Sequence, residues 1–152
     1  MDHIKLMDVQ SNHPDLSILT ERLDKYLYEL YPPEEVFQVD FEDPSKDKIE
    51  IVIAYLQGKP VGCGSIKEID DKAVELKRFF VLEDYRNQGI AGLILKTMES
   101  KARIKNYKVM RLETGDQQVE AIGFYSKHEF YEMDRFGEYA DCPSSVCMEK
   151  TL

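Results

Sequence analysis

The sequence predicts an α/β fold with a single domain, in which helices flank a mixed central β-sheet. Three observations lead to this prediction. The chain has 152 residues, a usual length for one domain. Short apolar runs, alternating or continuous, indicate strands, and most of them lie after residue 48. Segments in which apolar residues recur at helical spacing alternate with these strands in the second half of the chain.

The composition is that of a globular protein with excess negative charge. Hydrophobic residues make up 43% of the chain and charged residues 32%, and the net charge is −9. This charge disfavours a nucleic acid or an anionic membrane as a partner. No apolar run approaches the ~20 residues that span a bilayer, and the N-terminus lacks the pattern of a signal peptide. We therefore expect a cytoplasmic protein and, because its three cysteines fit no zinc-binding spacing, no metal site.

The N-terminal third is expected to form one strand and two helices. The strand is Ile4–Val9, and polar residues before Pro14 can cap a helix whose first position suits proline. Leucines at helical spacing give this helix an apolar face, and two consecutive prolines, 32 and 33, end it. A short second helix is predicted over residues 34–41.

The middle of the chain is expected to form an antiparallel meander of three strands. The first begins near residue 49, and the next two cover residues 61–69 and 74–81, with tight turns between them. The strand at 74–81 alternates imperfectly and is largely apolar, which indicates burial on both faces.

The rest of the chain is expected to alternate helices and strands over about residues 88–105, 109–113, 118–127, 130–133 and 145–149. Only the strands on either side of the 88–105 helix can form a right-handed β-α-β crossover. The strands at 74–81 and 109–113 are therefore predicted to be parallel neighbours.

The turn between the strand at 74–81 and the next helix has the features of a phosphate-binding loop. It reads Arg86-Asn87-Gln88-Gly89-Ile90-Ala91-Gly92. A glycine-containing turn that opens a helix gathers free backbone N–H groups at the positive end of the helix dipole, where a pyrophosphate can bind. The turn matches neither GxxxxGK[ST] nor GxGxxG. The alternative is an ordinary helix start with a solvated arginine.

This loop resembles the R/Q-x-x-G-x-G/A signature of the GNAT superfamily, the acetyl-CoA-dependent N-acetyltransferases. Residues 121–130, AIGFYSKHEF, are similar to the family segment A-x-x-[FL]-Y-x-K-x-G-F, and the resemblance covers roughly residues 50–150 in the family's order. One departure is Glu129, which stands where the family has glycine. If that position needs a positive φ, glutamate is strained there and the placing of Tyr125 is affected.

The resemblance implies one acetyltransferase domain over residues 1–152, with the strands at 74–81 and 109–113 splayed apart to admit acetyl-CoA. The residues implied to bind this co-substrate lie on the strand, the loop and a later helix: Phe79, Phe80, Val81, Arg86, Asn87, Gln88, Gly89, Ile90, Ala91, Gly92 and Phe124. A backbone N–H of the strand is implied to polarise the thioester carbonyl.

Two side chains are candidates for the proton transfers. Tyr125, a phenol with an ordinary pKa of ~10, can protonate the leaving thiolate; the alternative is an aromatic core residue. Glu75 lies eleven residues before Arg86, a spacing that matches the catalytic glutamate of the histone acetyltransferase branch. Burial can raise the pKa of such a carboxylate to a useful value; the alternatives are a solvent-facing or lysine-paired glutamate, or proton loss through ordered water. Cys63 has no visible base beside it, so we expect direct transfer in a ternary complex.

The leading interpretation is acetyl transfer to a primary amine of a small acceptor. In this fold the N-terminal segment lines the acceptor side of the cleft, and the first 50 residues carry thirteen acidic against five basic side chains. This charge favours a cationic acceptor, unless it is only a solvated surface. Its acidic residues near the predicted second helix are Glu34, Glu35, Asp40, Glu42 and Asp43. The alternatives are a non-catalytic acyl-CoA-binding sensor or an interaction domain, and the acceptor's identity and the oligomeric state, a homodimer included, stay open.

Overall fold

The computed structural model describes residues 3–37 and 49–152. Within these residues, seven strands form one mixed sheet in the order β1-β2-β3-β4-β5-β7-β6. The strands are β1 (Ile4–Val9), β2 (Ile49–Leu56), β3 (Lys59–Glu68), β4 (Ala73–Val81), β5 (Val109–Gly115), β6 (Tyr131–Met133) and β7 (Ser145–Thr151). The helices are α1 (Pro14–Leu30), α2 (Ile90–Ile104) and α3 (Val119–Lys127), with short 3-10 turns at η1 (Pro33–Glu35), η3 (Glu83–Tyr85) and η4 (Gly137–Tyr139). The predicted fold class is confirmed.

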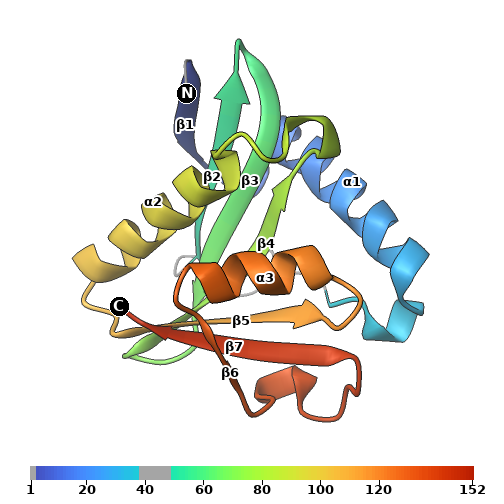
Figure 1. Ribbon diagram of the computed structural model, residues 1–152. Helices are drawn as coiled ribbons and strands as arrows, with labels where there is room; N and C mark the ends of the chain where they lie inside the picture. The colour runs from blue at the N-terminus through green and yellow to red at the C-terminus, as the bar shows by residue number, and fades with distance from the viewer. Residues whose placement is uncertain (1–2, 38–48) are drawn as a thin grey trace.

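The sheet carries helices on both faces (Figure 1). On one face, most of the leucine stripe predicted for α1 packs against β2 and β3, with Leu19 and Ile53 completely inaccessible, whereas Leu30 at the end of the helix is exposed. On the other face, α2 and α3 cover a larger core that includes Ile94 and Leu112. β2 and β3 lie between the two cores, which explains why their sequences are apolar at successive positions.

β4 and β5 are parallel neighbours over only part of their length. Their register pairs run from Ala73 and Val109 to Leu76 and Leu112, and then the strands separate. Beyond this point β4 stays paired with β3, and β5 stays paired with β7. Figure 1 shows the result, in which β5 and β7 run across the direction of β2, β3 and β4. The predicted parallel pairing is confirmed, and the separation opens the sheet at its middle.

The prediction of a helix over residues 34–41 is wrong for residues 34–37, the part that the structure describes. One 3-10 turn, η1, ends at Glu35, and Val36 is extended, with φ −100° and ψ 109°. Residues 38–48, which include the rest of this prediction, lie outside the described residues. β5 is also longer than the predicted 109–113, because Thr114 and Gly115 pair with β7 as well.

The C-terminal end of α1 is fixed beside the end of β5. The Tyr31 hydroxyl accepts a hydrogen bond from the Gln117 backbone N–H at 2.9 Å. Its ring lies so close to Gly115 that a Cβ built there would be 1.9 Å from the Tyr31 hydroxyl oxygen. Glycine is therefore required at this position if α1 is to lie against the open end of β5.

α3 ends in a Schellman cap. The Phe130 N–H donates to the Tyr125 carbonyl at 3.0 Å, and the Glu129 N–H donates to the Ser126 carbonyl at 3.1 Å. Glu129 has φ 75°, in the left-handed region that favours glycine. The strain expected for a glutamate in place of the family's glycine therefore has its structural cause in this cap, which also fixes the backbone of Tyr125.

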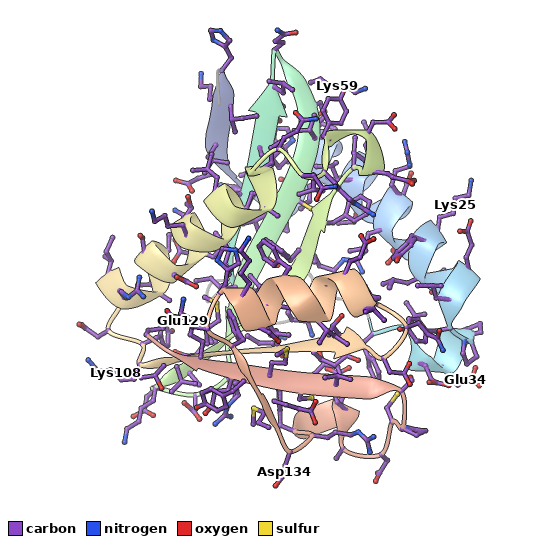
Figure 2. All side chains as sticks on the ribbon, viewed as in Figure 1. Lys25, Glu34, Lys59, Lys108, Glu129 and Asp134 are labelled. Atoms are coloured by element: carbon purple, nitrogen blue, oxygen red, sulfur yellow. The ribbon has the colours of Figure 1, made fainter. Side chains whose placement is uncertain are left out.

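Replacing Glu129 with glycine is expected to raise the free energy of unfolding by ~1 kcal/mol, because glycine adopts a left-handed conformation without the Cβ penalty. Figure 2 shows Glu129 beside the end of α3, where its side chain is 85% exposed and lies 3.9 Å from Lys150 Nζ. Such an exposed ion pair contributes little. Glu129→Ala is the matched control, since it removes the same carboxylate and keeps the Cβ. Urea denaturation measures all three proteins; equal stability of the two variants would contradict the strain.

Candidate active site

The separation of β4 and β5 opens a cleft that is also lined by α1, η1, α3 and η4. Its cavity volume is about 100 Å³, which is room for several water molecules. The titratable side chains on its walls include Glu35, Glu75, Lys77, Glu113, Tyr125 and Tyr139. The two residues that the sequence singled out for proton transfer, Glu75 and Tyr125, thus line the same cleft although they are far apart in the chain.

Side chains reach this cleft from both faces of the sheet. Leu76 and Leu112 belong to the core under α2 and α3. Because side chains alternate along a strand, Glu75 and Glu113 point to the opposite face, on the α1 side. Tyr125 belongs to α3 and comes from the first face. The cleft therefore joins the two faces at the gap between the strands.

A β-bulge shapes the β4 edge of the gap. Lys77 pairs with Ser65 and Phe80 pairs with Cys63, so two residues of β4 stand opposite one residue of β3. The first of the two, Arg78, has φ 52°, a strained conformation for a residue other than glycine. Bulges of this kind turn backbone groups out of the regular ladder, here on the edge that faces the gap.

The predicted phosphate loop forms the N-terminal end of α2. Gly89 caps the helix with φ 83°, and Asn87 also has a positive φ of 62°. The first hydrogen bond of the helix runs from the Leu93 N–H to the Gly89 carbonyl at 3.1 Å. The helix itself therefore does not use the N–H groups of Ile90, Ala91 and Gly92. Asn87, Gln88 and Gly89 are exposed residues beside them, so the loop has the donors that an anion requires.

Arg86 ties this loop to the end of β4. Its Nε donates to the Val81 carbonyl at 2.9 Å, and its guanidinium lies 5.6 Å from the ring centroid of Phe80 and 5.8 Å from that of Tyr26. The side chain thus has a fixed position with part of its guanidinium engaged by the protein. Its remaining N–H groups are the ones that could contact an anion.

The three strand residues predicted to bind the co-substrate lie in different environments. The Phe79 side chain lines the cleft. Phe80 is buried on the α1 side and Val81 is buried on the α2 side. Only the backbone of Phe80 and Val81 is therefore available to a ligand in the gap, whereas Phe79 also offers its ring.

Tyr125 lies in an aromatic cluster on α3 and is 7% exposed. Its ring centroid is 5.9 Å from that of Phe79, 5.6 Å from that of Phe124 and 5.7 Å from that of Phe130. Burial, assisted by the charge of Glu113, raises the pKa of Tyr125. The phenol therefore keeps its proton at neutral pH and can act as a donor. The two interpretations of this tyrosine are compatible, since it packs in the core and also lines the cleft.

Glu75 is buried and bound by two partners. Its Oε2 accepts a hydrogen bond from the Tyr139 hydroxyl at 2.5 Å and lies 3.7 Å from Lys77 Nζ. Burial raises the pKa of Glu75, although Lys77 and the hydrogen bond from Tyr139 oppose this effect. The solvent-facing alternative for Glu75 is therefore wrong, and the pairing with Lys77 is observed inside the cleft.

Glu113 is a second carboxylate in the cleft, and it is not among the residues predicted from the sequence. The Ser145 hydroxyl donates to its Oε2 at 2.6 Å. Burial raises the pKa of Glu113 to about 7; the bond from Ser145 opposes this, and the charge of Glu75 adds to it. Its position at the end of a strand predicted to lie beside 74–81 was the signal that could have identified it. Tyr139, in contrast, belongs to an irregular segment without periodicity.

Negative charge predominates among the side chains at the α1 side of the cleft. Glu35 lines the cavity, whereas Glu34 is exposed. The other acidic residues expected here, Asp40, Glu42 and Asp43, lie outside the described residues. The cations of β4 are paired, since Lys77 lies 3.9 Å from Glu138 and Arg78 lies 2.7 Å from Asp24.

Residues 3–37 and 49–152 contain no group of three or more His, Cys, Asp or Glu side chains placed to hold a metal ion. None of the described helices is long and apolar enough to cross a membrane.

Comparison with known proteins assigns the family. Residues 16–130 match the acetyltransferase (GNAT) family. An IAA acetyltransferase of Azospirillum brasilense is 36% identical over 135 residues, which are 88% of each protein. A structure of the acyl-CoA N-acyltransferase class from Klebsiella pneumoniae subsp. pneumoniae has a TM-score of 0.87 and 27% identity, and covers 98% of this chain and 97% of its own.

A GNAT family acetyltransferase of Elizabethkingia anophelis, whose crystal structure contains acetyl-CoA, shares the fold with a TM-score of 0.71 and 22% identity over 100% of both chains. The family match spans most of the chain and agrees with the separated central strands and the loop at α2. This chain belongs to the GNAT family of acetyltransferases and is an acyl-transferring enzyme.

Proposed function

We propose that this enzyme transfers the acetyl group of acetyl-CoA directly to a primary amine of a small, cationic acceptor within a ternary complex. The observation that carries the proposal is the cleft itself. Backbone donors, a neutral phenol and two carboxylates with raised pKa converge at one gap between two strands. These are the groups that acyl transfer to an amine requires.

The residues of the α2 side fit acetyl-CoA. The N–H groups of residues 88–92 are donors for a pyrophosphate, and Arg86 stabilises the loop and contributes positive charge. Along the edge of β4 that β5 leaves unpaired, the backbone of Phe79, Phe80 and Val81 can pair with the extended pantetheine chain. Phe124 packs beside Phe79, with centroids 5.8 Å apart, and borders the same path. The acetyl-CoA complex of the Elizabethkingia relative supports this choice of co-substrate.

The proposed reaction breaks the C–S bond of the thioester and forms a C–N bond to the acceptor. A carboxylate of the cleft takes the proton that the amine loses, and Tyr125 donates its phenolic proton to the sulfur. N–H groups of the β4 bulge stabilise the negative charge that develops on the carbonyl oxygen. Cys63 forms no acyl intermediate, because it is completely buried and its thiol donates to the Arg78 carbonyl at 3.2 Å.

Glu75 and Glu113 are both candidates for the base. Glu75 is the residue that family resemblance indicates, but Tyr139 and Lys77 occupy its Oε2. Glu113 has a pKa of about 7, close to the value at which a general base is most effective near neutral pH. We assign the proton-accepting role to this pair of carboxylates, with Glu113 as the member that takes the proton and Glu75 as its buried neighbour.

The excess of carboxylates in the cleft supports a cationic acceptor. Glu35, Glu75 and Glu113 line the cavity, and the nearby cations Lys77 and Arg78 are each paired with acidic residues. A cleft with this charge concentrates ammonium compounds and repels carboxylates.

A second candidate acceptor is the IAA named for the Azospirillum relative, because that protein is 36% identical to this chain. The alternative of a non-catalytic sensor would rest on the unusual glutamate at position 129. Glu129 does not support it, because this residue forms part of the α3 cap and lies outside the cleft lining.

Tyr125→Phe is expected to lower kcat by ~10²-fold or more and to leave the affinity for acetyl-CoA nearly unchanged, because the hydroxyl is needed only as the thiolate develops. Steady-state kinetics and calorimetry measure the two quantities. Phe124→Leu is the control variant, because it removes an aromatic ring beside Tyr125 but leaves the Tyr125 hydroxyl in place. A Tyr125→Phe enzyme with wild-type kcat at neutral pH would assign Tyr125 to packing alone.

Glu113→Gln is expected to remove an acid limb near pH 7 from the profile of kcat/KM, because the base must be deprotonated to accept a proton. The wild-type rate falls as the pH drops below this pKa, while any limb due to the acceptor amine is common to all variants. Glu75→Gln is the matched variant. Loss of the acid limb in Glu75→Gln alone would identify Glu75, and not Glu113, as the general base. An acid limb that persists in both variants would mean that neither carboxylate is the base and that ordered water accepts the proton.

An acceptor panel tests the proposed substrate class. Release of the CoA thiol is measured with polyamines, neutral amino compounds, amino acids and IAA at two salt concentrations. We expect the highest kcat/KM for a cationic amine, and we expect this value to fall as salt rises, since exposed charges are screened over ~8 Å at physiological salt. A preference for anionic acceptors, or a rate for the cationic amine that is independent of salt, would rule out the proposed class.

A further inference from the structure

Two consecutive carbonyl groups in the β4 bulge are bound by side chains of β3. The Ser65 hydroxyl donates to the Lys77 carbonyl at 2.7 Å, and the Cys63 thiol donates to the Arg78 carbonyl at 3.2 Å. Neither donor reaches the cleft, since Ser65 is 2% exposed and Cys63 is inaccessible. The side chains therefore contact the active site only through the backbone of β4.

The orientation of these carbonyls fixes the direction of two N–H groups. In a trans peptide, the carbonyl of one residue and the N–H of the next point in opposite directions, and the described residues contain no cis peptide bond. The Lys77 and Arg78 carbonyls are directed toward the β3 side chains that donate to them, so we infer that the N–H groups of Arg78 and Phe79 are directed away from these side chains, toward the gap. Successive N–H groups of a regular strand point to opposite sides, which is why this arrangement needs a bulge.

We propose that Ser65 and Cys63 are positioning residues for acyl transfer: by holding the two bulge carbonyls, they aim the N–H groups of Arg78 and Phe79 at the thioester carbonyl oxygen. The inference rests on the proposed function, because it assumes that the thioester lies in the gap. Neither residue is catalytic in itself, since neither touches the reacting atoms.

The surroundings of Ser65 and Cys63 support this role over simple packing. On the neighbouring strand β2 their register partners are Ile51 and Ile53, members of the apolar core under α1. A buried hydroxyl in such a core is unfavourable unless it makes a hydrogen bond. Burial raises the pKa of the Cys63 thiol to about 12, so this group keeps the proton that it donates.

α1 fixes the same bulge by binding the side chain of Arg78. The Arg78 Nη2 lies 2.7 Å from Asp24 Oδ1 and donates to the Thr20 carbonyl at 3.1 Å. A strained backbone persists only where its surroundings fix it from several sides. Here β3 fixes the carbonyls of the bulge, and α1 fixes the side chain of its strained residue.

The direct test is the infrared stretching frequency of the thioester carbonyl in acetyl-CoA labelled with ¹³C at that carbon and bound without acceptor. Donors aimed at the oxygen lower this frequency relative to free acetyl-CoA. We expect a clear lowering in the wild type, a smaller one in Ser65→Ala, and almost none in the Ser65→Ala/Cys63→Ala double variant. Ser65→Cys and Cys63→Ser keep a donor at each position and are expected to restore most of the lowering.

The kinetic expectation is a fall in kcat of ~10-fold for Ser65→Ala and ~10²-fold for the double variant, with the dissociation constant of acetyl-CoA changed less than about twofold. Wild-type frequency and kcat in Ser65→Ala would overturn the proposal, as would equal losses in Ser65→Ala and Ser65→Cys. If Ser65→Ala does not fold, the comparison of Cys63→Ala with Cys63→Ser decides. A wild-type enzyme that lowers the frequency but releases no CoA with any amine would contradict the proposed function and leave the positioning role supported.

Discussion

The interruption of strand pairing between β4 and β5 is the constraint on which the rest of the structure depends. Both strands remain bonded on their other sides, so the sheet opens along one line only. α2 leaves this line uncovered because it lies close over β3, where a Cβ built at Gly64 would be 2.8 Å from Ile94 Cγ2. The gap is bordered instead by α3, whose Tyr125 reaches it, and by the end of α1, which Tyr31 holds beside Gly115.

The raised pKa of Glu113 makes its contribution to stability smaller at neutral pH than at acidic pH. Glu113 has a pKa of about 7 in the folded protein against an ordinary value of 4.5, so the folded state holds the proton more tightly than the unfolded state. The contribution of this group to stability is therefore complete below pH 4.5 and is lost as the pH rises toward 7. The hydrogen bond from Ser145 and the charge of Lys77 limit this loss without removing it. Such a site is expected where function, rather than folding, selects the residue.

Local sequence patterns predicted the helices and strands of this fold. The features that they did not predict depend on contacts between residues that are distant in the sequence. Leucine spacing and paired prolines sufficed for α1, and a glycine turn after an apolar strand sufficed for the loop at α2. The imperfect alternation of apolar and polar residues around Phe79 is consistent with the bulge, but only the pairing with β3 shows where the extra residue lies. Glu99 is buried in α2 because Lys150, from β7, approaches it at 2.9 Å, and no local pattern contains that partner. The same holds for Tyr139, which reaches Glu75 from an irregular segment.

The two faces of the sheet separate the chemical tasks of the proposed reaction. The predicted phosphate loop, Phe124 and Tyr125 belong to the α2–α3 side, whereas Glu75 and Glu113 belong to the α1 side. An acyl donor and an amine that approach from opposite faces can meet only where β4 and β5 are unpaired. Their reacting atoms then lie near the plane of the sheet, beside the backbone of the bulge. In the proposed reaction the position of Arg78 and Phe79 is therefore decisive, because a small rotation of their peptides would move the proposed donors away from the place where the two substrates meet.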